Sequence, residues 1–166
     1  MLEPVLALHL QRLGVNPARI GLVFGCAAIV LAMLHPLYGR LSDHLGARRL
    51  TLWGLAVSAS LMPLIGFITS FASAIPIFIL QTAALALVIA PSLAYMGEAT
   101  SSAGLESFGV AYGVYNVAWG FGLLAGPALG GFLFEHIGFS RLALWWSPAI
   151  LLLTLLVARV RHGTSS

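Results

Sequence analysis

Five uncharged apolar runs alternate with short polar connections along this chain of 166 residues. The runs occupy residues 20–38, 50–68, 76–97, 108–134 and 142–158. Each is close to the ~20 residues that a helix needs to cross a bilayer. A backbone surrounded by lipid must satisfy its own hydrogen bonds, so the pattern predicts five complete transmembrane helices.

The first residues predict an incomplete span. Residues 2–10 are apolar except for Glu3 and His9, and Gln11-Arg12 ends the run. Nine residues give ~14 Å of helix, about half of a crossing. We therefore expect a leading half-helix, and a chain that is a C-terminal portion of something larger or a truncated reading frame.

Helix boundaries have their own signals. Asn16-Pro17 is typical of an N-cap followed by proline at the first helical position. Gly46, Gly104 and Gly138 are predicted to lie in connections, where an open or left-handed backbone is tolerated.

Composition agrees with a membrane protein. Hydrophobic residues make up 60% of the chain and charged residues 8%, against ~25% charged in soluble domains. The eight basic residues are all arginines scattered between apolar runs, which does not fit a nucleic-acid binder. The single cysteine, Cys26, excludes an intrachain disulfide and a cysteine-based metal site.

The arginines also predict an orientation. Five fall on one side of the predicted spans (Arg40, Arg48, Arg49, Arg159 and Arg161), and three on the other (Arg12, Arg19 and Arg141). By the positive-inside rule, the first side and the C-terminus are cytoplasmic. Abundant Ala, Gly and Arg without Lys suggest a GC-rich bacterial genome, and therefore the bacterial inner membrane.

Two motifs stand out. The first, GRLSDHLGARR at residues 39–49, is predicted to be a tight turn in which Asp43 accepts hydrogen bonds from an arginine or from a helix N-terminus. An ordinary positive-inside loop is the alternative. The second motif is a set of glycines with a proline: Gly113, Gly122, Gly126, Pro127, Gly130 and Gly131. Gly122, Gly126 and Gly130 share one helical face, which predicts close helix packing, and Pro127 predicts a bend.

These motifs resemble two signatures of the major facilitator superfamily. The turn resembles its cytoplasmic signature loop, and the glycine pattern its antiporter signature. The resemblance implies an all-α membrane protein that is half of a twelve-helix bundle. Residues 1–166 form a single transmembrane domain, equivalent to helices seven (partial) to twelve. It also implies a latch role in gating for Gly39, Asp43, Gly46, Arg48 and Arg49.

Three stretches narrow the resemblance to multidrug/proton antiporters and vesicular amine transporters: MLEP at the start, residues 108–131 and the following IGF. It implies proton-coupled export of amphipathic organic cations, without an enzyme activity or cofactor and with the proton gradient as the driving force. An acid within a span is a default functional candidate, so Glu3 is expected to face a central cavity, unless it lies at a wet terminus. Two further acids of the amine transporters are replaced here by Ala86 and Asn116.

Further candidates are polar or aromatic residues in the spans. Tyr95, Tyr112, Tyr115 and Trp119 could stack on a cationic substrate or simply pack. Asn116 could bind substrate or a neighbouring helix, and His9 and His35 could titrate near neutral pH. Trp145 and Trp146 are expected at a membrane interface, and Glu98 and Glu106 in a polar connection.

Two other functions stay open at this stage. The chain could belong to a metabolite uptake symporter, because the missing acids weaken the case for proton antiport. It could also be a truncated or half transporter that is inactive without an N-terminal half. The expected partners are the lipid bilayer, a small organic substrate and that N-terminal half, covalent or separate.

Overall fold

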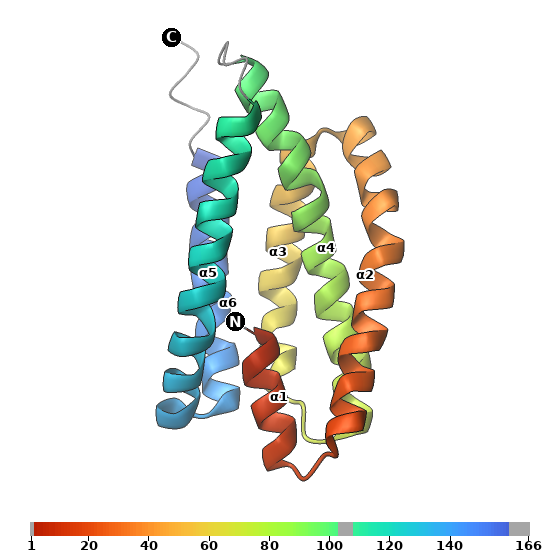
Figure 1. Ribbon diagram of the computed structural model, residues 1–166, viewed down its shortest axis with the longest axis vertical. Helices are drawn as coiled ribbons and strands as arrows, with labels where there is room; N and C mark the ends of the chain where they lie inside the picture. Colours follow the sequence, from red (N-terminus) through yellow and green to blue (C-terminus); the bar gives the residue numbers. More distant parts are fainter. Residues whose placement is uncertain (1, 103–107, 160–166) are drawn as a thin grey trace.

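The computed structural model describes residues 2–102 and 108–159, which form helices joined by short turns and contain no strand (Figure 1). The helices are α1 (Leu2–Arg12), α2 (Pro17–Leu45), α3 (Ala47–Ile65), α4 (Phe71–Ser102), α5 (Phe108–Ile137) and α6 (Phe139–Arg159). Four of these helices contain stretches long and apolar enough to cross a membrane: Pro17–Leu45, Phe71–Gly97, Gly109–Ile137 and Phe139–Leu156. Four of the five predicted spans are thus matched. The count of five complete spans and a half remains a prediction, because α3 is not among these four.

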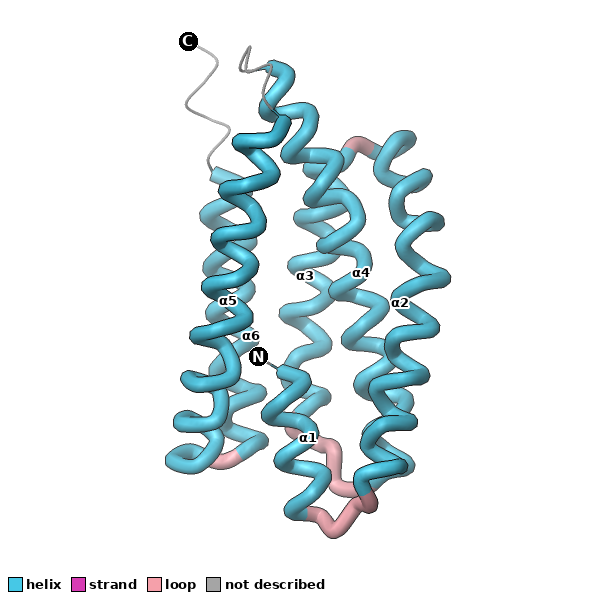
Figure 2. Tube along the Cα trace, in the orientation of Figure 1, coloured by secondary structure: helices cyan, strands magenta, loops and turns pink. Residues whose placement is uncertain are grey.

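Successive long helices run in opposite directions. Figure 2 shows the α1–α2, α3–α4 and α5–α6 connections at one end of the bundle and the α2–α3 turn at the other. Helix α4 packs against both α2 and α3, and α3 packs against α6. The short α1 lies beside the lower half of α5, so its first residues begin midway along the bundle (Figure 1).

The predicted helix ends are confirmed where the structure describes them. The Asn16 side chain accepts a hydrogen bond from the amide of Ala18 at 2.9 Å, and Pro17 begins α2. Gly46 and Gly138 lie between helices with φ of +86° and +79°, values that a side chain would strain. Gly104 lies outside the described residues.

Two predicted connections are shorter than expected. Residues 39–49 are helical except for Gly46, whose amide donates to the Ser42 carbonyl at 2.9 Å and closes α2. The helices continue up to that glycine because Ser42, Ala47 and Leu50 are buried against the bundle. Glu98 was likewise predicted in a connection but lies within α4, and Glu106 lies outside the described residues.

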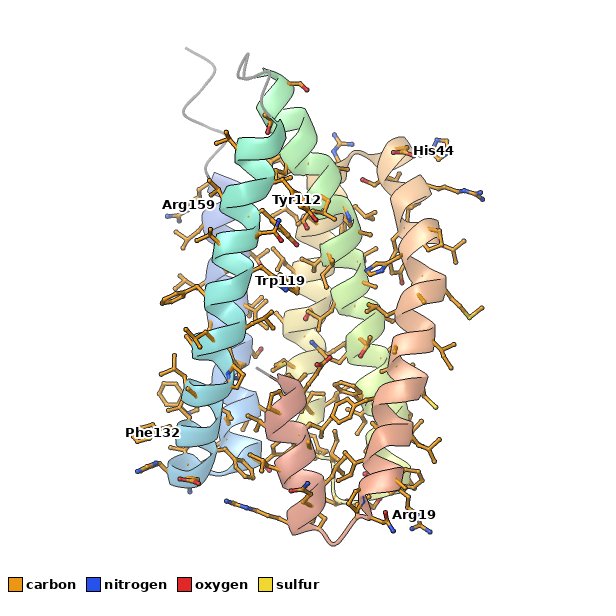
Figure 3. The ribbon with its side chains drawn as sticks, viewed as in Figure 1. Arg19, His44, Tyr112, Trp119, Phe132 and Arg159 are labelled. Carbon is orange, nitrogen blue, oxygen red and sulfur yellow. The ribbon has the colours of Figure 1, made fainter. Side chains whose placement is uncertain are left out.

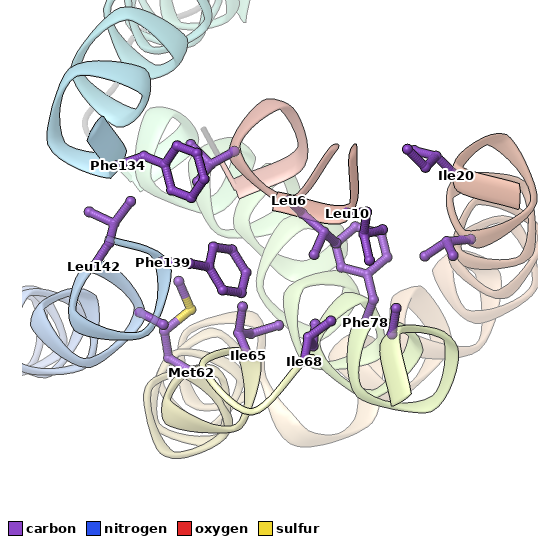
Figure 4. Close-up of a cluster of buried hydrophobic side chains, with 14 of the residues drawn as sticks. Leu6, Leu10, Ile20, Met62, Ile65, Ile68, Phe78, Phe134, Phe139 and Leu142 are labelled. Atoms are coloured by element: carbon purple, nitrogen blue, oxygen red, sulfur yellow. The ribbon is translucent and has the colours of Figure 1, made fainter. Parts of the chain in front are cut away.

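A buried apolar cluster fixes α1 to the other helices. Leu6 and Leu10 are fully buried in a cluster with side chains from the end of α3, the α3–α4 connection and the facing ends of α4, α5 and α6 (Figure 4). Labelled members from those elements are Ile65, Ile68, Phe78, Phe134, Phe139 and Leu142. Lipid tails are as apolar as these side chains, so close packing rather than exclusion of water holds the cluster together.

Helices α3 and α4 approach each other closely at Gly54. A Cβ on Gly54 would come within 2.7 Å of the Leu87 carbonyl carbon and oxygen, so only glycine permits this approach. Four residues along α3, the hydroxyl of Ser58 accepts a 2.7 Å hydrogen bond from Nε2 of Gln81. Both side chains are almost fully buried, which makes this polar pair part of the interface.

Candidate transport residues and gating turn

Three aromatic side chains form a ladder along α5. Tyr112 stacks on Tyr115 with ring centroids 6.2 Å apart, and Tyr115 stacks on Trp119 at 6.1 Å. The spacing of three and four residues places the rings on one helical face. Figure 3 shows Tyr112 and Trp119 projecting from α5 on its α4 side. Tyr112 is 54% exposed and Trp119 49% exposed, so the ladder presents accessible ring faces.

Asn116 lies beside this ladder and bonds within its own helix. Its Nδ2 donates to the Tyr112 carbonyl at 2.9 Å, the local back-bonding that asparagine offers a helix. Its side-chain oxygen accepts no hydrogen bond from any described residue. The interhelical bond considered from the sequence is therefore not formed within the described part of the chain, and an acceptor remains beside the aromatic rings.

Glu3 and Ala86 differ sharply in their surroundings. Glu3 is exposed in the first turn of α1, where it forms no ion pair or hydrogen bond with a described residue. Ala86 is fully buried in α4, so that position faces neighbouring helices and offers no proton-binding group. No hydrogen bond or ion pair joins Glu3 to the aromatic ladder among the described residues.

The latch role predicted for the gating turn stays a prediction. Asp43 and Arg49 are exposed, and neither forms an ion pair with a residue that the structure describes. Arg48 instead reaches across to α6, where its Nη2 donates to the carbonyl of Ala158 at 2.9 Å. The last carbonyls of a helix have no amide partner within the helix, and this bond supplies a partner for Ala158. The arginine charge is also favourable there, because the C-terminal end of a helix carries a partial negative charge.

Most of the patterned glycines on α5 are open. A Cβ at Gly113, Gly122 or Gly131 would meet no atom of the described chain within 4 Å. Gly130, in contrast, is buried. Helix α5 extends from Phe108 to Ile137 without a break at Pro127. The bend at this proline stays a prediction.

The two histidines in the apolar runs have different environments. His9 places Nε2 2.7 Å from the Ile68 carbonyl oxygen and stacks on Phe139, so it joins three elements. Nε2 of His35 is buried on α2 without a partner among the described residues. A buried ring nitrogen without a hydrogen-bond partner is uncommon in a folded protein.

Sequence reasoning missed the α3–α4 interface and the arginine bond to α6. The spacing of Gly54 and Ser58 is a small-xxx-small pattern that could have indicated the first. Gln81 is also the only carboxamide in the run from 76 to 97. The Arg48–Ala158 bond has no comparable signal, because it joins residues 110 positions apart.

Four long apolar helices define an integral membrane protein. The family model described as "Major Facilitator Superfamily" matches residues 1–165, and the chain belongs to this superfamily.

Two curated relatives match nearly the whole chain. The human MFS-type transporter SLC18B1 is 29% identical over 175 residues, which cover 98% of this chain and 37% of that protein. A multi-drug resistance efflux pump PmrA homolog from Lactococcus lactis is also 29% identical, over 98% of this chain and 40% of that protein. The chain therefore spans about two fifths of the length of these relatives.

Proposed function

We propose that this chain is the C-terminal half of a transporter that exports amphipathic organic cations in exchange for protons. Residues 1–166 would form one domain in which α1 is the second half of helix seven. Helices α2 to α6 would be five complete spans, helices eight to twelve. The chain would perform no covalent chemistry and would not be an enzyme, so function would reside in binding and movement alone.

The ladder of Tyr112, Tyr115 and Trp119, in which the first and last rings are exposed, is the observation that carries this proposal. A cation over the face of an aromatic ring gains ~0.5–2 kcal/mol, more when water is excluded. Asn116 adds a free carbonyl acceptor for an ammonium group on the same stretch of helix. The name of the Lactococcus relative, a multi-drug resistance efflux pump homolog, supports the export of drugs.

The exposure of α5 supports a requirement for an N-terminal half. Phe121 and Leu124 are 71% and 77% exposed, and the open glycines beside them leave room for a further helix. A substrate site near the membrane midplane would lie between this surface and the other half, with rocking of the halves giving alternating access. The arginine distribution supports a cytoplasmic C-terminus, and composition supports the bacterial inner membrane.

The test is transport in proteoliposomes. The chain, co-reconstituted with the N-terminal half of the Lactococcus relative or fused to it, should move ethidium against its gradient when a pH gradient is imposed. The chain alone should not. The proposal is wrong if the assembled halves bind ethidium but transport does not respond to the pH gradient.

The alternative is a metabolite uptake symporter, and the small number of acids in the predicted spans favours it. Ala86 is buried and Asn116 carries no charge, so Glu3 is the only acid within the predicted spans that could couple to protons. Uptake of a neutral or anionic solute in place of ethidium export would support this alternative.

A further inference from the structure

A shallow groove runs along the outer face of α3, near the α2–α3 turn. Arg49, Leu52, Trp53 and Ala56 line this groove, whose volume is about 300 Å³. Arg49 and Trp53 are four residues apart and therefore share one face of the helix. Trp53 is 69% exposed, so no other helix of the described chain covers it.

The groove continues into an exposed stripe that begins with a serine and ends with two apolar side chains. Ser60, Leu64 and Phe67 follow Ala56 at intervals of three or four residues and are all exposed. The face of α3 thus begins with a cation and an indole and then becomes predominantly apolar towards the other end of the bundle.

A second exposed arginine, Arg159 on α6, lies at the same end of the bundle as the head of this groove. The bond from Arg48 to the Ala158 carbonyl brings the start of α3 against the end of α6. Arg159 follows directly, and Figure 3 shows it at the same end of the bundle as His44. Arg49 and Arg159 are exposed and form no ion pair with any described residue. Asp43, across the turn, is also exposed and pairs with neither arginine in the described ranges.

We propose that this groove binds one anionic phospholipid. The phosphate would accept hydrogen bonds from the Arg49 guanidinium, with Arg159 adding to the positive field. An acyl chain would lie along Leu52, Trp53 and Ala56. Arginines near the membrane surface attract anionic lipid headgroups, and tryptophan favours the interface between headgroup and tail.

Charge complementarity selects this occupant over a protein helix. A transmembrane helix seated in the groove would bury the Arg49 guanidinium, which is costly in the membrane unless the helix supplied an acid at that depth. A phospholipid supplies the negative charge at the depth of the headgroups and the apolar chain below it. The site is separate from the aromatic ladder on α5, so this proposal does not depend on the transport proposal.

Quenching of Trp53 fluorescence by brominated lipids tests the site. The chain would carry phenylalanine in place of Trp119, Trp145 and Trp146, leaving Trp53 as the only indole. It would be placed in bilayers containing brominated phosphatidylglycerol or brominated phosphatidylcholine. We expect phosphatidylglycerol to be favoured about fivefold, the effect of roughly one arginine at the membrane surface.

Variants with matched charge changes distinguish lipid binding in the groove from a general attraction of anionic lipids to surface arginines. Arg49→Gln should abolish the lipid preference, and Arg49→Lys should keep most of it. Arg40→Gln removes an exposed arginine from the same end of the bundle, outside the groove, and should leave the preference unchanged. Arg49 is exposed, so circular dichroism should show the same helix content in all three variants.

Three outcomes would overturn the proposal. The first is equal quenching by the two lipids. The second is an equal loss of preference in Arg40→Gln and Arg49→Gln, which would indicate surface charge alone. The third is protection of Trp53 from both lipids in a chain that runs as a dimer, which would show that a second copy covers the groove.

Discussion

His9 stacks face to face on Phe139, with ring centroids 3.8 Å apart and ring planes 6° apart. The same imidazole places Nε2 2.7 Å from the carbonyl oxygen of Ile68, so the ring carries its proton on Nε2 and donates it there. One side chain on α1 therefore binds the α3–α4 connection and the start of α6 together.

Removing this ring should loosen the end of the bundle. His9→Ala loses a hydrogen bond and a stacked pair, together worth about 1–3 kcal/mol. The apparent melting temperature in detergent should fall by about 2–4 °C for each kcal/mol lost. His9→Phe should recover the stacking part only. His44→Ala, at an exposed site near the end of α2, is the control, and an equal shift in both alanine variants would contradict this account.

Gly54→Ala should destabilise the protein although alanine is the better helix former. The added Cβ would meet the Leu87 carbonyl at 2.7 Å, and overpacking of this kind costs about 1–3 kcal/mol. Gly25→Ala is the matched control, because no described atom lies within 4 Å of its Cβ position. That change should stabilise α2 by up to about 1 kcal/mol. Thermal unfolding of the two variants should therefore shift in opposite directions, and a shift in the same direction would refute the close contact.

Arg48→Gln should fray the end of α6. Hydrogen bonds to charged groups contribute about 1.5–3 kcal/mol, so amides of the last turn of α6 should exchange at least about tenfold faster. Hydrogen–deuterium exchange measured by mass spectrometry would report this on peptides ending near Arg159. Arg49→Gln should leave exchange of that turn unchanged, because only Arg48 is bonded to Ala158. Equal exchange in the two variants would show that the bond does not hold the helix end.

Trp119→Leu should weaken binding of an organic cation. Loss of one ring face from the ladder removes ~0.5–2 kcal/mol, which raises the KM for ethidium by about twofold to thirtyfold. Trp145→Leu is the control, since Trp145 is on α6, is 73% exposed and lies outside the ladder. Transport assays on the assembled halves would measure both, and an unchanged KM in Trp119→Leu would remove the ladder from substrate binding.

Glu3→Gln tests proton coupling. If Glu3 binds and releases the coupled proton, the amide variant should still bind ethidium but should not accumulate it in response to a pH gradient. Asp43→Asn is a useful comparison, because it removes an exposed acid from the gating turn and not from the predicted proton site. Unchanged coupling in Glu3→Gln would exclude the residue from the mechanism.

The sequence determined the membrane character, most of the helices and several of their ends. Uncharged runs of about 20 residues have few alternatives to a spanning helix, and Asn16-Pro17, Gly46 and Gly138 act through local backbone chemistry. The motif at residues 39–49 and the glycine pattern indicated the superfamily, to which the chain belongs.

Only the tertiary structure decided which side chains meet. Gly113, Gly122 and Gly131 of α5, prominent in the sequence, face open space, whereas the less conspicuous Gly54 lies in close contact with α4. Arg48 binds α6, and Arg49, its neighbour, lines a groove on the outside. A helix turns by about 100° per residue, so adjacent residues point in different directions, and what each one meets depends on how the other helices pack.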